Sequence, residues 1–440
     1  MLTSARWIWQ ASDWPALRFD AQAVQPQLAA ARLAQGKLLG IASSLQLVDL
    51  AELQLTEWTQ EAIATAQIEG EVLQVNSVRA SAARRLGLPG ASAAPRDART
   101  EATLDVLQAA IGQWQQPLTQ NDLFAWHAAL FPTGRSGLSQ IVTGGWRTHA
   151  EPMQIVTPTV PRIAPRDGVR GALATHGGVA VLAQTPGLAC GQRLATDADD
   201  AAPIRPARRS AAPGKPDVLH YQAPASADVP AHMAAWLQWF NASLGALDGV
   251  ARAALAHLWF EAIHPFEDGN GRIGRAVVEL ALAQDLQSPQ RLMSVSAQLL
   301  AARADYYAQL QAATGRPELD VTPWVGWFAA RVQRAAEAAA AHVQSALDKT
   351  AFWSRLTAAH PDLSAAQRKT LGKLFDAGPD GLAGGMSTEK YVNLTGVSRA
   401  TAYRELTDLT ECGLLERTGQ GRGTRYRLVG GVDAKTGCSS

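Results

Sequence analysis

The sequence has few cysteines, almost no net charge and no long apolar run. Its three cysteines, Cys190, Cys412 and Cys438, are scattered and odd in number, without metal-ligand spacing, which favours a reducing compartment over a disulfide scaffold. A formal net charge of +1 gives no whole-protein attraction to nucleic acid or membranes. No stretch approaches the ~18 apolar residues of a membrane span, and the N-terminus has no apolar signal core. We therefore expect a cytoplasmic protein without a membrane partner.

The most informative stretch that is present is His264–Arg275, with the sequence HPFEDGNGRIGR. Apolar residues at helical spacing precede and follow it, which predicts a helix, a tight loop and a second helix. Pro265 disfavours a helical conformation at His264, and Gly269 and Gly271 allow backbone angles that other residues avoid. The loop amides can therefore surround an anion at the start of the second helix.

Charged and titratable side chains accompany this loop. Arg272 and Arg275, three residues apart on the first turn of the helix, face one side and suit phosphate oxygens. Asp268 is an acid among cationic groups, which makes sense if it holds a divalent metal ion on those phosphates. His264, at the mouth of the loop, is the only group there able to take a proton near neutral pH.

This stretch resembles the signature of the Fic family, H-P-F-x-D/E-G-N-G-R-x-x-R, at every fixed position. A lone histidine or glycine-rich loop is usually structural, but nine specified positions in order favour the family. The resemblance implies transfer of AMP from ATP, with Mg²⁺, to a hydroxyl group of a target protein. It implies that His264 is the base and Asp268 the magnesium ligand. The other residues that it assigns to catalysis or to nucleotide binding are Gly269, Asn270, Gly271, Arg272 and Arg275.

A second motif, Thr65–Gly70, ends a predicted helix with the sequence TAQIEG. On its own it is an ordinary helix C-terminus stopped by glycine, where a glutamate is usually a solvated charge. It also resembles the inhibitory motif of the Fic family, S/T-x-x-x-E-G/N. The resemblance implies that Glu69 pairs with Arg275 and denies that arginine to the outer phosphate of ATP. Thr65, Glu69 and Gly70 are therefore our candidate regulatory residues.

The N-terminal domain is expected to span residues 1–86. Its aromatic-rich opening, residues 7–19, is expected to pack as a short strand and loop on the first helices. Pro26 is expected to begin a helix that runs to about Leu39, and Ser44 to cap the longer helix that carries Glu69.

The catalytic domain is expected to span residues 87–350. Gly145–Arg147 resembles the segment that precedes the family's β-hairpin flap, and the flap strands are predicted at Met153–Val156 and Val218–Pro224. Between them, residues 158–217 contain no Phe, Trp, Tyr or Glu, so they have little to bury. We interpret 158–217 as a disordered insertion at the tip of the flap.

Residues 351–430 are expected to form a separate domain that resembles a winged helix-turn-helix. Thr395–Val397 predicts the turn, and two alternating strands flank a glycine-rich wing at Gly419–Gly423. Residues 398–428 contain six arginines and four acids, a mild excess that leaves two roles open for 352–430, DNA binding or a protein contact such as a homodimer. The residues expected to face DNA are Arg399, Thr401, Tyr403 and Arg404 in the major groove and Arg422 on a phosphate.

The sequence thus predicts a mainly α-helical protein with a Fic-type helical core, a small β-hairpin flap, an N-terminal helical domain and a C-terminal winged helix. The leading hypothesis is an adenylyltransferase inhibited by Glu69, with another protein or the chain itself as AMP acceptor. One alternative is removal of AMP from a modified protein by the same site, with Glu69 positioning water. The other is a DNA-binding regulator whose Fic core senses nucleotide. The presence of His264 and Asp268 argues against it, because a site that only binds nucleotide needs neither a base nor a metal ligand.

Overall fold

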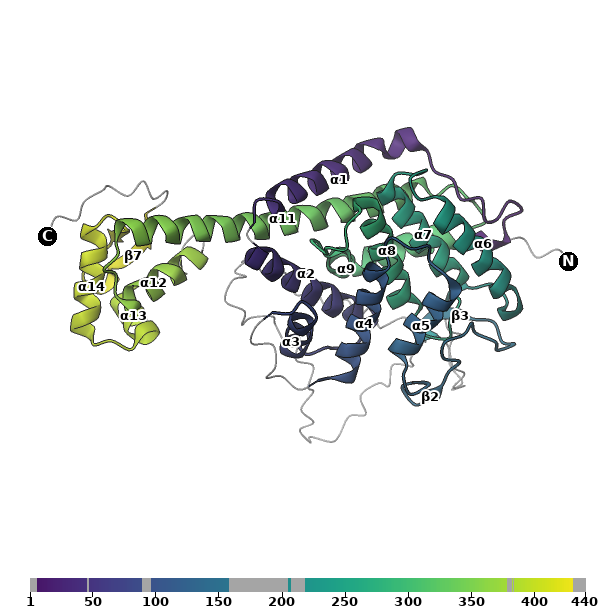
Figure 1. Ribbon diagram of the computed structural model, residues 1–440, viewed down its shortest axis with the longest axis horizontal. Helices are drawn as coiled ribbons and strands as arrows, with labels where there is room; N and C mark the ends of the chain where they lie inside the picture. Colours follow the sequence, from purple (N-terminus) through teal and green to yellow (C-terminus); the bar gives the residue numbers. More distant parts are fainter. Residues whose placement is uncertain are drawn as a thin grey trace, which may run out of the picture. The chain divides into compact units, whose positions relative to one another are not determined.

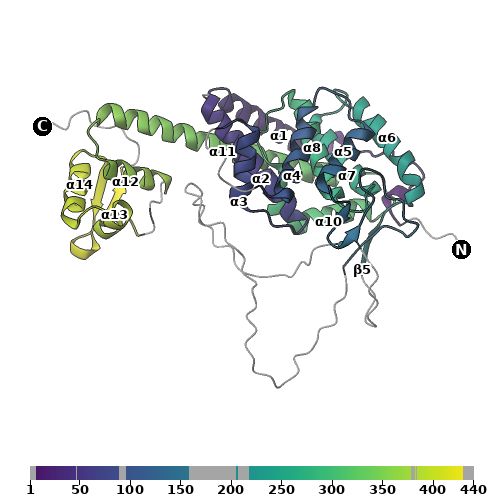
Figure 2. The same cartoon turned by 60° about the horizontal axis from the view of Figure 1, so that its bottom comes forward.

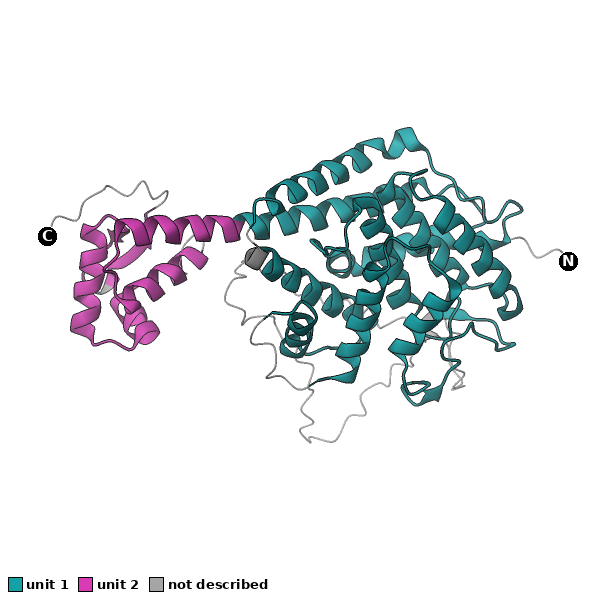
Figure 3. Cartoon of the chain, in the orientation of Figure 1, with its two compact units in different colours: residues 1–164, 199–344 teal, residues 165–198, 345–440 magenta. Residues whose placement is uncertain are grey.

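The structure is a computed structural model that describes residues 6–45, 47–88, 96–157, 205–206, 218–377, 382 and 384–429. The described residues form two compact units, one up to residue 344 and one from residue 345 onward (Figure 3). No helix within these ranges is long and apolar enough to cross a membrane. Apart from residues 205–206, the insertion predicted at 158–217 lies outside the described residues.

The first unit is mainly helical, as predicted, with α7 and α8 at its centre between α2 and α4 on one side and α6 on the other (Figure 1). Its helices are α1 (Ala21–Ala42), α2 (Leu47–Ile68), α3 (Val75–Arg85), α4 (Ala98–Gly112), α5 (Gln120–Leu130), α6 (Val229–Ala242), α7 (Gly249–Ile263), α8 (Asn270–Leu286), α9 (Val295–Ala301), α10 (Arg303–Thr314) and the first part of α11 (Thr322–Ala359), with short 3-10 helices η1 (Ile8–Gln10) and η2 (Ser226–Asp228).

Helix α7 is buried on all sides, which marks it as a core helix rather than a surface one. Its first residue, Gly249, packs so closely on α8 that a Cβ atom there would lie 2.0 Å from Asp285. From α6, the fully buried Trp236 donates its indole N–H to the carbonyl of Ala256 on α7 at 3.1 Å. The loop that follows α7 is therefore attached to a closely packed core helix.

The N-terminal region differs from the sequence prediction in three places. Its opening forms the 3-10 helix η1 instead of a strand. Helix α1 begins before Pro26, because the side chain of Asp20 caps it by accepting from the amides of Gln22 and Ala23. Ser44 does not cap the next helix, since its hydroxyl donates back to the carbonyl of Ile41 at 2.6 Å.

A small antiparallel sheet forms the predicted flap. Strand β3 (Gln154–Thr157) pairs with β5 (Val218–Gln222), and β4 (Arg205–Pro206) adds to the other side of β3, which gives the order β4-β3-β5. The register shifts between Ile155 and Val156. Helix α10 lies beside β5 (Figure 2). A separate hairpin of β1 (Arg135–Ser136) and β2 (Ser139–Gln140) follows α5.

The second unit begins within α11 and has the element order of a winged helix-turn-helix. Its remaining elements are α12 (Ala365–Asp376), α13 (Thr388–Thr395), α14 (Arg399–Glu411), β6 (Leu415–Thr418), the 3-10 turn η3 (Gly421–Gly423) and β7 (Arg425–Leu428). Strands β6 and β7 pair antiparallel, and Met386 forms a bridge to Tyr426 that the sequence did not predict.

The turn between α13 and α14 forms as predicted. Gly396 ends α13 with a φ of 78°, and the side chain of Ser398 caps α14 by accepting from the amide of Thr401. On the inner face of α14, the buried carboxylate of Glu405 accepts from the hydroxyls of Ser364 at 2.6 Å and Tyr391 at 2.7 Å. These bonds fix which face of α14 is buried and leave the opposite face exposed.

Candidate active site

The chain turns sharply at the end of α7, and His264 forms the turn. Its φ of 52° and ψ of 60° are left-handed, a conformation that costs energy in a residue with a side chain. The buried Arg147 holds this turn, because its Nε donates to the carbonyl of His264 at 2.8 Å and its Nη2 to that of Ile263 at 3.3 Å. A cation thereby caps the carbonyl end of α7.

The loop between α7 and α8 is held by two side chains. Asn270 accepts from the amide of Phe266 at 2.9 Å and donates to its carbonyl at 2.8 Å. His127 accepts at Nδ1 from the amide of Gly144, so its Nε2 carries the proton and donates to the carbonyl of Asp268 at 3.2 Å. Its ring also stacks on Phe266 with centroids 4.2 Å apart. The chain's own side chains thus fix the shape of the loop.

The loop leads into the N-terminus of α8, which is open to an anion. Gly269 precedes the helix with a φ of 82°, and no side chain caps the first amides. A Cβ atom at Gly269 would lie 2.8 Å from the ring of Phe131. Both the positive φ and this close ring therefore require glycine at position 269. Unpaired amides and the helix dipole together favour a negative group at this position.

Arg275, one turn into α8, is bound by the predicted regulatory motif Thr65–Gly70. Its Nε donates to the hydroxyl of Thr65 at 2.7 Å, and its Nη2 to the carbonyl of Thr65 at 3.0 Å and to Glu69 Oε1 at 2.7 Å. Burial alone would lower the pKa of Arg275, but the charge of Glu69 reverses this and raises it. Gly70, with a φ of 78°, directs the chain away after Glu69.

Glu69 also lies directly against the first turn of α8. A Cβ atom on Gly271 would be 2.2 Å from Glu69 Oε1 and 3.0 Å from Arg275 Nη1. The missing side chain of Gly271 therefore makes room for the carboxylate. Glu69 holds Arg275 and occupies space beside the amides that would bind an anion.

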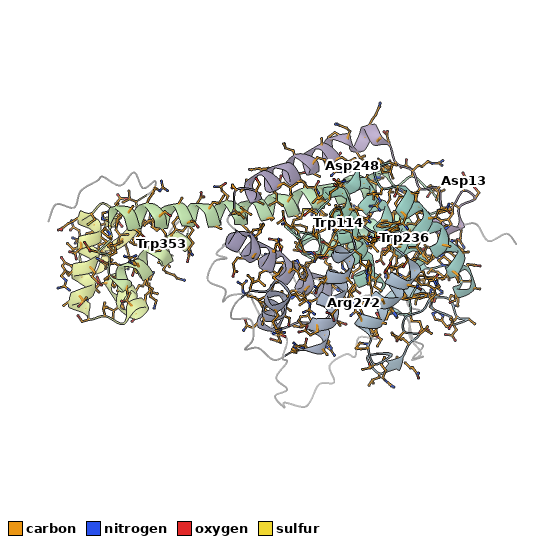
Figure 4. All side chains as sticks on the ribbon, viewed as in Figure 1. Asp13, Trp114, Trp236, Asp248, Arg272 and Trp353 are labelled. Atoms are coloured by element: carbon orange, nitrogen blue, oxygen red, sulfur yellow. The ribbon has the colours of Figure 1, made fainter. Side chains whose placement is uncertain are left out.

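Arg272 is bound by a different acid of the same N-terminal segment. Its Nη1 donates to Glu71 at 3.1 Å, and its Nη2 lies 3.8 Å from Asp268. The guanidinium group, 8% exposed, also lies over the ring of Phe131 at 5.0 Å. Arg272, labelled in Figure 4, lies among the helices of the first unit. Both arginines of the loop are therefore paired with acids that follow α2.

The proposed metal ligand, Asp268, is a single carboxylate at the rim of the site and is 33% exposed. It accepts from the hydroxyl of Ser136 and, at 2.6 Å, from the amide of Gly269. The described residues contain no group of three or more metal-ligating side chains. This fits magnesium, which is often held by one or two carboxylates together with substrate phosphates and water. In such a complex Asp268 would hold the ion, which would neutralise phosphate charge.

Two titratable groups lie at the mouth of the loop, not one as the sequence suggested. Burial, together with the nearby charge of Arg147, lowers the pKa of His264 to about 4. Burial raises the pKa of Glu261 to about 8, although Arg275 opposes this. At neutral pH His264 is therefore unprotonated, which is the state that a base requires.

Comparison with known proteins assigns this site to a family. The sequence profile of the Fic/DOC family matches residues 188–282, which include the whole stretch His264–Arg275. The segment that carries the site therefore belongs to a Fic domain. Two further profiles flank the Fic match: a domain of unknown function, DUF4172, at residues 7–88, and the C-terminal domain of a transcriptional regulator, DIP2311-like, at residues 382–429. The domain boundaries given above remain a prediction.

Curated relatives match only part of this chain. Over 143 residues it is 31% identical to protein adenylyltransferase fic-1 of Caenorhabditis briggsae, and over 94 residues 34% identical to that of Caenorhabditis elegans. These matches cover 32% and 21% of this chain, and 25% and 17% of the relatives. The chain thus spans about a quarter or less of the curated relatives' length.

Solved structures of Fic proteins also align with it. A Fic family protein from Desulfovibrio desulfuricans G20 aligns over 92% of this chain and 97% of that chain, with 20% identity and a TM-score of 0.45. A Fic domain containing signaling protein from Bacteroides thetaiotaomicron VPI-5482 aligns over 72% and 97%, with 16% identity and a TM-score of 0.46.

The Fic loop has partners that sequence reasoning missed. The contacts of Glu71 with Arg272, Ser136 with Asp268 and Phe131 with Arg272 come from segments far away in the chain. Only Glu71 had a usable signal, since it stands two residues after Glu69. Glu261 had none beyond its place one turn before His264, where a glutamate is usually a solvated charge.

We predict that His127 makes the first unit less stable in mild acid. Burial lowers its pKa to about 4, so between pH 6.5 and 4 the unfolded chain binds a proton that the folded chain does not. The free energy of unfolding should then fall by about 2 kcal/mol from this group between pH 7 and 5. His127→Phe keeps a ring beside Phe266 but does not titrate, so its stability should fall less over this range. Denaturant unfolding at both pH values measures this, and an equal fall in both proteins would contradict it.

Proposed function

We propose that the chain is a protein adenylyltransferase, which transfers AMP from ATP to a hydroxyl group of a target protein or of the chain itself. The proposal is carried by one arrangement: His264 stands at the entrance of a rigid loop, and Arg272 and Arg275 lie beside the uncapped amides that begin α8. Transfer of a phosphoryl-type group depends mainly on positioning and charge neutralisation, which such a loop supplies. The curated fic-1 relatives are named for this activity.

In the proposed reaction, the hydroxyl oxygen of the target forms a bond to the α-phosphorus of ATP. The bond from the α-phosphorus to the oxygen that bridges to the β-phosphate breaks, and its electron pair leaves with pyrophosphate. The hydroxyl proton moves to Nε2 of His264. Nδ1 of His264 faces the backbone carbonyl of Glu261 at 3.4 Å, and a carbonyl only accepts. Nδ1 therefore carries the proton in the neutral ring, and Nε2 has the free lone pair.

We further propose that Glu69 keeps this activity low. Its 2.7 Å contact with Arg275 occupies a donor that the outer phosphate of ATP would use. ATP then enters with its phosphates turned away from in-line attack. The competing proposal is the reverse chemistry, in which Glu69 positions a water molecule that removes AMP from a modified protein. The two proposals differ in what loss of Glu69 does to the transfer rate.

For the second unit we propose DNA binding through α14. Its exposed face carries Arg399, Arg404 and Tyr403, the last 56% exposed, while its opposite face is buried. Arginine and tyrosine on an exposed recognition helix suit phosphates and base edges. The match to a transcriptional regulator's C-terminal domain supports this proposal. Arg422, also expected on a phosphate, has a side chain outside the described ones. A regulator whose Fic core only senses nucleotide is the alternative function.

The first test removes the base. In a Glu69→Gly background, His264→Ala should lower AMP transfer by about 10²–10⁴-fold, while ATP still binds because the loop is held by Asn270, His127 and Arg147. Transfer of label from α-labelled ATP to protein and equilibrium nucleotide binding are the two measurements. His149→Ala, at a histidine outside the loop, is the matched control and should transfer normally. Equal transfer in His264→Ala would remove the assignment of His264 as the base.

The second test concerns inhibition. Glu69→Gly should raise transfer by roughly tens-fold or more, mainly in kcat, because Arg275 becomes free to orient the phosphates. Adding Arg275→Ala should abolish the gain. Glu52→Ala, an exposed acid on α2, is the control. An unchanged rate in Glu69→Gly would make the ion pair of Glu69 with Arg275 a structural contact without an inhibitory role, and a loss of AMP removal would favour the reverse chemistry.

The third test concerns DNA. Arg399→Ala with Arg404→Ala should weaken binding of the full chain to duplex DNA and reduce the log–log salt slope by about one for each lost phosphate contact. Arg355→Ala, an exposed arginine on α11, is the control and should leave the slope unchanged. Binding titrations at several salt concentrations measure this. No binding to any duplex at low salt would favour a protein contact.

A further inference from the structure

A buried acid lies behind the proposed base. Glu261 stands one helical turn before His264 on α7, and its side chain is only 11% exposed. Its Oε2 is 3.7 Å from Nδ1 of His264, and its backbone carbonyl is 3.4 Å from the same nitrogen. Both oxygens therefore face the ring nitrogen that does not receive the hydroxyl proton in the proposed reaction.

The carboxyl group of Glu261 is buried with one oxygen unpaired in the described part of the chain. Its Oε1 has no hydrogen-bond partner among the described residues. A Cβ atom on Gly274 would lie 2.7 Å from this oxygen and 3.0 Å from Nδ1 of His257. Nδ1 of His257 also has no hydrogen-bond partner among the described residues. A buried polar atom without a partner costs free energy. An acid kept at this cost beside a histidine is a candidate for a role in chemistry.

The charges around Glu261 connect it to the regulatory contact. The titratable groups that face it are His257 on α7, His264 directly after α7, Arg275 on α8, Glu69 after α2, Tyr306 on α10 and Tyr221 on β5. Burial raises its pKa to about 8; Arg275 acts against this and Glu69 adds to it. Loss of the charge of Glu69 would therefore lower the pKa of Glu261 and favour its ionised form.

We propose that Glu261 is a positioning residue for His264 in the proposed AMP transfer. Its carboxyl group lies 3.7 Å from Nδ1, on the N–H side of the ring, and adds to the preference that the backbone carbonyl sets for the tautomer whose Nε2 faces the hydroxyl. As Nε2 takes the proton from the hydroxyl oxygen, the ionised carboxyl group stabilises the imidazolium that forms, and the Nδ1 proton stays in place. This is the arrangement of nucleophile, base and orienting acid used in other group-transfer sites. The inference rests on the proposed function.

The test uses the full chain with Glu69→Gly. Adding Glu261→Gln, which keeps the size but not the charge, should lower kcat by about 10–100-fold, a share of what a general base supplies, with KM for ATP unchanged. Without the substitution at position 261, kcat should rise as pH increases to 8, because an ionised Glu261 makes His264 a stronger base; Glu261→Gln should lose this rise. Glu279→Gln is the matched control, since Glu279 is also buried with a pKa raised to about 8, but pairs with Arg291 at 3.2 Å.

Three outcomes would overturn the proposal. One is an unchanged kcat and pH profile in Glu261→Gln, and another is an equal loss in Glu279→Gln. The third is independent of transfer: nitrogen NMR of labelled histidine should show His264 protonated at Nδ1 in the unsubstituted chain and shifted toward Nε2 in Glu261→Leu. An unchanged tautomer there rejects the positioning role even if the chain transfers no AMP. If Glu261→Leu does not fold, Glu261→Gln still decides through kcat and its pH profile.

Discussion

The buried guanidinium group of Arg275 is the point where the N-terminal segment that follows α2 meets helix α8, just after the loop between α7 and α8. The side chain is 2% exposed and is bound by Thr65 and Glu69. A buried cation without an anion is destabilising, so a negative partner on Arg275 stabilises the folded chain. Glu69 is that partner here, and a phosphate would be the partner in the proposed active state. The proposed inhibition would thus be an exchange of anions on one arginine.

This exchange works only if the loop itself stays in place. Arg147 holds its beginning, Asn270 spans it and His127 holds the carbonyl of Asp268. These bonds are made by groups that do not change charge near neutral pH, because the pKa of His127 is about 4 and that of Arg147 about 10. The loop is therefore held in one conformation, and in the proposed activation the part that would move is the carboxylate of Glu69.

The loop was predictable from sequence because its determinants are local. Proline and glycine set its backbone, and the spacing of Arg272 and Arg275 sets their common face. Of the two acids that bind those arginines, Glu69 was predictable because it belongs to a known motif, whereas Glu71 was not. The contacts of Glu71 with Arg272 and of Ser136 with Asp268 arise from packing between distant segments. The start of α1 was misplaced because Pro26 is a strong local signal. The cap at Asp20 and the burial of Val24 outweigh its missing hydrogen bond.

Thr65 fixes the orientation of the Arg275 guanidinium group, which Glu69 alone would not do. Its hydroxyl and carbonyl hold Nε and Nη2 of Arg275 independently of the carboxylate. If Glu69 turned away, the guanidinium group would keep its orientation, with one Nη2 donor released toward the loop. The arginine would not have to search for its position when a phosphate arrives, so less ordering entropy would oppose binding. The helix that delivers the inhibitor would therefore also preorganise the group that it inhibits, and activation would need a side-chain movement and not the departure of α2.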